Sequence, residues 1–84
     1  MNKLIYFYSQ TCSPCHQMGP IINQISNTGI EVIKIDTGTD NPQTKKFNVR
    51  SVPTLIKTNA HNDDLGRLVG FNTFGKVYEF FKQG

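Results

Sequence analysis

Residues 3–22 read KLIYFYSQTCSPCHQMGPII, and the character of the chain changes halfway along them. Lys3–Tyr8 is rich in β-forming residues, which predicts a buried strand. Ser13–Asn27 instead carries one apolar stripe with helical spacing, formed by Met18, Ile21, Ile22 and Ile25. Cys12 and Cys15 therefore fall where a strand ends and a helix begins.

The prolines and glycines of this segment agree with a helix over Ser13–Asn27. Pro14 suits the first turn, where its missing N–H costs nothing, and Gly29 suits the far end. Pro20 lies inside the helix, so we expect it to kink the helix there.

The rest of the chain alternates further strands with two more helices. Apolar and turn-forming residues predict strands at Ile30–Asp36, Val52–Thr58 and Leu65–Val69, a short helix at Pro42–Phe47, and a last helix capped by Thr73. The predicted order is β-α-β-α-β-β-α, an α/β fold with a four-stranded mixed sheet and three helices. We expect the first two strands to be parallel and the last two to form an antiparallel hairpin.

The chain has 84 residues, a length that predicts a single domain over residues 1–84. Its net charge is +3. Its basic residues form no stripe with aromatic residues, which argues against a nucleic-acid partner. The longest apolar run, Leu4–Tyr8, is far shorter than the ~20 residues of a membrane span and too short for a signal peptide. We therefore expect a cytoplasmic monomer that binds no membrane.

Only two cysteines are present, three positions apart. A disulfide between them closes a very small loop and restricts the unfolded chain little, so it would contribute little to the stability of the fold. In a reducing compartment such a pair is more often catalytic or metal-binding.

The start of a helix gives Cys12 a specific chemistry. Free N–H groups and the positive end of the helix dipole stabilise a thiolate there, so we expect Cys12 to have a lowered pKa. A thiol with a pKa of ~8.5 is about 3% ionised at pH 7, whereas one with a pKa near 7 is about half ionised. Cys12 is thus the predicted nucleophile in disulfide exchange, and Cys15, one helical turn on, can resolve the mixed disulfide. Pro14 stiffens the loop between them.

Two metal-centred interpretations compete with this one. Cys12 to His16 spells C-x-x-C-H, the pattern of haem attachment, but the chain shows no export signal and is rich in strands. Zinc could use Cys12, Cys15, His16 and His61, yet the long gap to His61 matches no compact ligand spacing. We therefore expect no metal and no haem.

These residues together resemble the thioredoxin-like family. The matching features are a strand followed by C-x-P-C at a helix start, and an aliphatic-Pro-Thr segment ahead of a later strand. They include Cys12, Pro14, Cys15, Pro20, Asp36, the run from Phe47 to Thr54, Gly70 and the terminal amphipathic helix. The resemblance covers nearly the whole chain but lacks the family's usual leading strand and helix.

The resemblance implies a dithiol that serves as its own redox centre, with no bound cofactor. It also implies a cis peptide bond before Pro53, packed against the cysteines, which leaves the backbone of Val52 free to pair with an extended substrate segment. The implied motif and groove residues are Ser13, Pro14, Val52, Pro53, Thr54 and Gly70.

Four positions depart from the family pattern. Thr11 stands where the family usually has Trp, and Tyr6 replaces the buried Asp of the first shared strand. Val32 replaces the associated Lys, and His16 replaces the customary Lys after the second cysteine. His16 is a candidate modulator of the thiol pKa and a candidate base for Cys15, although it lies about 100° around the helix from Cys15. Water or the leaving Cys12 thiolate are the alternative bases.

We therefore expect a thiol–disulfide oxidoreductase that acts on disulfide-containing proteins and takes electrons from a reductase or from glutathione. A glutathione-dependent glutaredoxin is the nearest alternative, although Ser13–Pro14 and the single Gly70 depart from that pattern. A non-catalytic thioredoxin-like binding subunit and a metal-binding module are the other possibilities.

Overall fold

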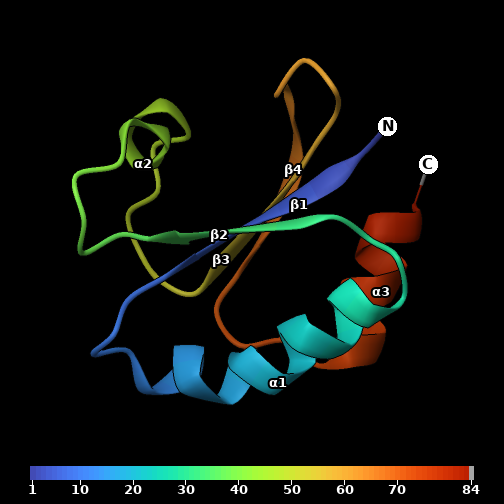
Figure 1. Cartoon of the computed structure of the whole chain (residues 1–84), viewed down its shortest axis with the longest axis horizontal. Helices are drawn as coiled ribbons and strands as arrows, with labels where there is room; N and C mark the ends of the chain where they lie inside the picture. The colour runs from blue at the N-terminus through green and yellow to red at the C-terminus, as the bar shows by residue number, and fades with distance from the viewer. Residues whose placement is uncertain (84) are drawn as a thin grey trace.

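The computed structural model describes residues 1–83 and contains four strands and three helices (Figure 1). In chain order they are β1 (Lys3–Tyr8), α1 (Ser13–Asn27), β2 (Val32–Asp36), α2 (Pro42–Lys46), β3 (Thr54–Thr58), β4 (Asp64–Val69) and α3 (Phe74–Lys82). The predicted order β-α-β-α-β-β-α is confirmed.

The strands form one mixed sheet in the order β2-β1-β3-β4. β1 pairs in parallel with β2, with Phe7 opposite Ile35, and in antiparallel with β3, with Phe7 opposite Thr54. β3 and β4 form the predicted antiparallel hairpin. β1 is thus a central strand, and the loop that follows it emerges next to the start of β3.

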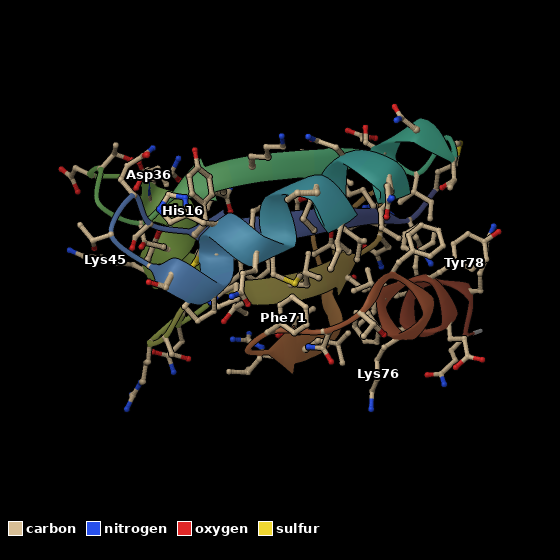
Figure 2. The ribbon with its side chains drawn as sticks, turned by 90° about the horizontal axis from the view of Figure 1, so that it is seen from below. His16, Asp36, Lys45, Phe71, Lys76 and Tyr78 are labelled. Carbon is tan, nitrogen blue, oxygen red and sulfur yellow. A yellow bond between two sulfur atoms is a disulfide. The ribbon has the colours of Figure 1, made fainter. Side chains whose placement is uncertain are left out.

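β1 is buried on both faces of the sheet, which explains its continuous apolar sequence. Leu4 and Tyr6 face one core, which α1 and α3 cover, while Ile5 and Phe7 face a second core with Phe47. Figure 1 shows α1 and α3 together on one side of the sheet and α2 on the other, and Figure 2 shows α1 and α3 side by side over the strands.

Each helix begins where the sequence offers a capping side chain. Cys12, Asn41 and Thr73 each accept a hydrogen bond from a main-chain N–H in the first turn of α1, α2 and α3 respectively. The predicted cap at Thr73 is therefore confirmed. α1 continues as one helix through Pro20, and Gly29 follows its end with φ +95°.

The strand ends differ from the prediction by one or two residues. β2 begins at Val32, although the preceding Ile30 is buried in the core. β3 begins at Thr54, because Pro53 has no N–H for the ladder, and β4 begins one residue early, at Asp64. Within residues 1–83, no helix combines the length and apolar character needed to cross a membrane.

Candidate active site

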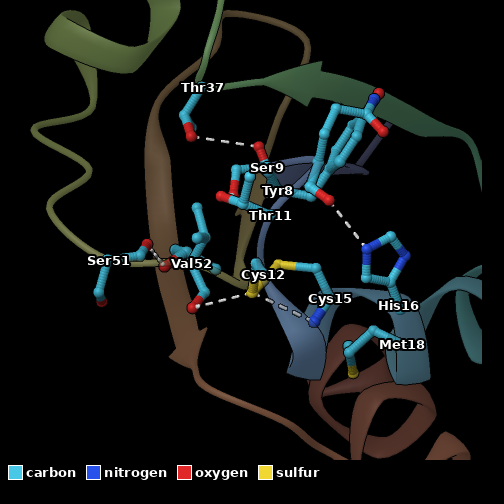
Figure 3. Close-up of a disulfide and its surroundings, with 12 residues drawn as sticks. Tyr8, Ser9, Thr11, Cys12, Cys15, His16, Met18, Thr37, Ser51 and Val52 are labelled. Atoms are coloured by element: carbon cyan, nitrogen blue, oxygen red, sulfur yellow. Dashed lines mark hydrogen bonds between the residues drawn. A yellow bond between two sulfur atoms is a disulfide. The ribbon is translucent and has the colours of Figure 1, made fainter.

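The two cysteines lie at the junction of β1 and α1, where they form a disulfide (Figure 3). Their Cα atoms are 5.2 Å apart. Cys12 is the N-cap of α1 and Cys15 lies in its first turn, while Pro14 occupies the start of the helix. Cys12 is half-buried, whereas Cys15 is only 4% exposed. An incoming reagent therefore reaches the Cys12 sulfur first.

Two main-chain groups face the Cys12 sulfur. The N–H of Cys15 donates a hydrogen bond to Cys12 Sγ at 3.2 Å, and Cys12 Sγ lies 3.6 Å from the carbonyl oxygen of Val52. An N–H that points at a sulfur stabilises negative charge on it. The positive, N-terminal end of the α1 dipole stabilises the same charge. The arrangement favours a thiolate at Cys12 once the disulfide is reduced.

The Val52–Pro53 peptide bond is cis, as the resemblance implies. Pro53 is fully buried, and neighbouring groups hold its loop in place: Thr54 Oγ1 donates to the carbonyl of Ser51 at 2.8 Å, and the Gly70 N–H donates to the carbonyl of Pro53 at 2.8 Å. The structure thus joins Pro53, Thr54 and Gly70 to the loop of Val52, whose carbonyl lies beside Cys12 Sγ. Ser13 and Pro14 are exposed on the turn that carries it.

The segment after β4 forms an apolar border near this loop. Val69 and Phe71 are 59% and 46% exposed, on either side of Gly70, which has φ +87°. The Asn72 N–H donates to Met18 Sδ at 3.4 Å, which ties this segment to α1. Figure 2 shows Phe71 between the end of β4 and α1.

Tyr6 occupies the interior behind Cys15. It is 4% exposed, and its hydroxyl donates a hydrogen bond to the Cys15 carbonyl at 3.0 Å. Burial, and to a lesser degree the nearby Tyr8 hydroxyl, raises the pKa of Tyr6 above its usual value. A cavity of about 250 Å³ reaches this region, and its lining includes Tyr6, Tyr8, Cys15, His16 and Lys34.

His16 is exposed and its ring lies against the loop before Cys12. Its Nε2 is 2.9 Å from the carbonyl oxygen of Gln10 (Figure 3). A carbonyl can only accept, so Nε2 carries the proton of this hydrogen bond.

Thr11 is also exposed, with its hydroxyl 3.5 Å from that of Ser9. His61 lies apart from the cysteines, in the exposed turn between β3 and β4.

Sequence reasoning did not anticipate two parts of this neighbourhood. One is the hydrogen bond from Tyr6 to Cys15, and the other is a polar cavity beside Val52 that Arg50 and Thr44 help to line. No sequence signal marks either of them. Among residues 1–83, no three His, Cys, Asp or Glu side chains are grouped closely enough to hold a metal ion.

Comparison with known proteins agrees with this geometry. A thioredoxin-like protein of Synechocystis is 36% identical over 56 residues, which cover 63% of this chain and 53% of that protein. Thioredoxin of Staphylococcus haemolyticus is 32% identical over 73 residues, covering 82% of this chain and 68% of the relative. Two chloroplastic thioredoxins of Arabidopsis thaliana are matched over 34% and 33% of their length, so the chain spans about half or less of the length of these relatives and of the Synechocystis protein.

The solved structure of thioredoxin-2 from a malaria parasite superposes on this fold with a TM-score of 0.89 at 21% identity, over 100% of this chain and 84% of that one. The family model for thioredoxin matches residues 1–83. With a C-x-x-C disulfide at the start of α1 in a four-stranded sheet of this topology, the chain belongs to the thioredoxin family.

Proposed function

We propose that this protein is a thiol–disulfide oxidoreductase that reduces or exchanges protein disulfides through Cys12 and Cys15. The observation that carries the proposal is the position of the Cys12 sulfur. It is accessible, it faces the N–H of Cys15, and it lies next to the main chain of Val52.

The proposed reaction transfers two electrons from the protein dithiol to the substrate disulfide. The Cys12 thiolate attacks one substrate sulfur, the substrate S–S bond breaks, and the other substrate sulfur leaves as a thiolate that takes a proton from solvent. Cys15 then loses its proton and attacks Cys12 Sγ. The Cys12–Cys15 disulfide forms and the second substrate thiol is released.

The difference in exposure between the two cysteines supports this division of roles. Cys15 is almost fully buried behind Cys12, so it reaches a mixed disulfide on Cys12 without competing for the substrate. Short spacing within one helical turn makes that second step intramolecular and therefore fast.

The main chain at Val52 offers a place for the substrate. Within residues 1–83 its N–H makes no hydrogen bond, and its carbonyl faces only Cys12 Sγ. An extended substrate segment can pair with these groups and so present its cysteine to Cys12. Pro53, Thr54 and Gly70 hold that edge in position, while Ser13 and Pro14 border it on the side of α1.

His16 is proposed to modulate the thiol pKa, because it follows Cys15 directly and its ring is fixed by Gln10. We further propose that the protein acts as a cytoplasmic monomer and is re-reduced by a reductase or by glutathione. The reduction potential distinguishes a reductant from a disulfide former, because such pairs span about −270 to −120 mV.

The test is reduction of insulin disulfides by the wild-type protein and by three variants. Cys12→Ser removes the nucleophile, so turnover is expected to cease. Cys15→Ser leaves the nucleophile but not the resolving thiol, so a mixed disulfide should accumulate, visible by mass spectrometry. His61→Gln, in the exposed turn, serves as the control and should retain full turnover. Undiminished turnover in Cys12→Ser would overturn the proposed mechanism.

A further inference from the structure

A second cavity, of about 240 Å³, lies beside the Cys12 disulfide on the side of the Val52 loop. It is lined by Thr37, Thr44, Val49, Arg50, Ser51 and Val52. Val52 belongs both to this lining and to the surroundings of Cys12, because its carbonyl is 3.6 Å from the sulfur. Figure 3 shows Ser51 and Val52 next to Cys12, on the side away from His16.

The cavity contains hydrogen-bond donors that have no partner within residues 1–83. Thr44 Oγ1 is buried and unpaired, which costs free energy unless a ligand or water satisfies it. Arg50 uses Nε for Asn48 Oδ1, at 3.3 Å, and its two terminal nitrogens have no hydrogen-bond partner among residues 1–83. The exposed Ser51 adds a hydroxyl to the same lining.

Arg50 is the charged residue of the cavity lining, which includes no Asp or Glu. Residues 41–52 include Lys45, Lys46 and Arg50 but no acidic residue, and Asp40 lies immediately before them. The acid next to Thr37 in the chain is Asp36, and both of its carboxylate oxygens are engaged elsewhere: Gln10 Nε2 donates to one at 3.3 Å and the Gly38 N–H to the other at 2.8 Å. The cavity lining therefore offers a guanidinium and hydroxyl donors and contains no carboxylate.

From this arrangement we propose that the cavity is a carboxylate subsite, which selects substrates with an Asp or Glu close to the reactive cysteine. The proposal rests on the proposed oxidoreductase function, because the substrate backbone must pair with Val52 for its side chain to enter. Successive residues of an extended chain rise about 3.3 Å and point to opposite sides. The selected acid thus lies one or two residues from the cysteine.

The test uses short peptides whose single cysteine carries a 2-thiopyridyl group. When the Cys12 thiolate attacks the peptide sulfur, neutral pyridine-2-thione leaves and is measured by its absorbance, and Cys15 then displaces the peptide thiol. Each peptide has Asp, or in its partner Asn, at one of the two positions before or after the cysteine. The readout is the ratio of the Asp rate to the Asn rate at each position.

For the wild-type protein we expect the Asp peptide to react about two- to five-fold faster than its Asn partner at one position or more, as for a partly exposed charge pair. The ratio should decrease towards one with added salt. Arg50→Gln should bring the ratio of the Asp rate to the Asn rate close to one. Thr44→Val, which keeps the side-chain shape, should reduce the preference.

Lys45→Gln is the matched control, because it removes the same charge from the exposed face of α2, outside the cavity lining. It should keep the preference for Asp. Equal rates for Asp and Asn peptides at every position would overturn the proposed subsite and leave the oxidoreductase function standing. An equal loss of the preference for Asp in Lys45→Gln and Arg50→Gln would have the same consequence. Release of thione by Cys12→Ser at the wild-type rate would instead overturn the proposed function, and the subsite with it.

Discussion

The hydroxyl of Tyr6 donates a hydrogen bond to the main-chain carbonyl of Cys15 at 3.0 Å, so the central strand β1 holds the first turn of α1 directly. The position is the one at which the sequence departs from the family's buried Asp. A neutral donor therefore lies behind the resolving cysteine, where the family usually has an acid.

Tyr6→Phe is expected to destabilise the protein by about 1 kcal/mol, because it removes one buried hydrogen bond and keeps the ring. Its pH dependence has a definite sign. The raised pKa means that the unfolded state loses the phenolic proton first, so wild-type stability falls as the pH rises above 10.0. The Phe variant should lack this part of the loss.

Urea unfolding at neutral and alkaline pH measures both effects. Tyr8→Phe is the control, since Tyr8 stacks on Tyr6 with ring centroids 5.4 Å apart and is only half-buried. Equal losses of stability in the two variants at neutral pH would contradict a specific role for the Tyr6 hydroxyl.

Phe71→Ser is expected to raise KM for a protein disulfide several-fold while leaving kcat for a small disulfide unchanged. The ring is 46% exposed beside Gly70, so it can contact a large substrate but supports little of the core. The free energy of unfolding should change by less than about 0.5 kcal/mol. Leu65→Ser is the matched control, because Leu65 is also 46% exposed but lies at the far end of β4. A similar rise in KM for both variants would exclude a local contact at Phe71.

Gly70→Ala is expected to cost about 1 kcal/mol of stability, measured by urea unfolding. The cause is backbone strain alone, since Gly70 has φ +87° and an added Cβ would meet no atom within 4 Å. Gly75→Ala provides the comparison. Its Cβ also meets nothing, but it lies in the first turn of α3, so that variant should gain stability rather than lose it. Losses of the same size at both glycines would rule out this explanation.

Thr73→Ala is expected to lower stability by about 1 kcal/mol, because Thr73 Oγ1 accepts from the Lys76 N–H at 3.3 Å and caps α3. Thr73→Ser should retain most of the wild-type stability, since it keeps the accepting hydroxyl. Thermal unfolding of the three proteins checks this order, and a Ser variant as unstable as the Ala variant would show that the methyl group, not the cap, matters.

The elements with strong local patterns were predictable from the sequence. The bounds of β1 and α1 agree with the prediction, because the apolar run ends at Tyr8 and the helical stripe ends at Ile25, within a turn of the last helical residue Asn27. The sequence predicts a start of β2 at Ile30, two residues before the observed one, because Ile30 is apolar. Ile30 is indeed buried, but burial alone does not require a place in the sheet ladder. The position of the cysteine pair likewise followed from the junction of strand and helix.

The surroundings of the site were less predictable. Val52, Pro53, Thr54 and Gly70 came from family resemblance, since no local pattern places them beside Cys12. The cavity formed by Thr37, Thr44 and Arg50 depends on how the loop after β2 packs against the segment after α2, and its polar residues resemble ordinary solvent-exposed ones in the sequence. Contacts between distant segments are set by strand register, which sequence periodicity does not report.

The pairing of β1 with β3 also has a consequence for the newly synthesised chain. Cys12 and Val52 are separated by 40 positions, and they meet only because Phe7 lies opposite Thr54. During translation both thiols therefore emerge before the segment that completes their surroundings, by roughly 2 to 8 seconds at ordinary synthesis rates. In that interval the Cys12 sulfur lacks its contact with the Val52 carbonyl, which forms only when β3 has paired with β1.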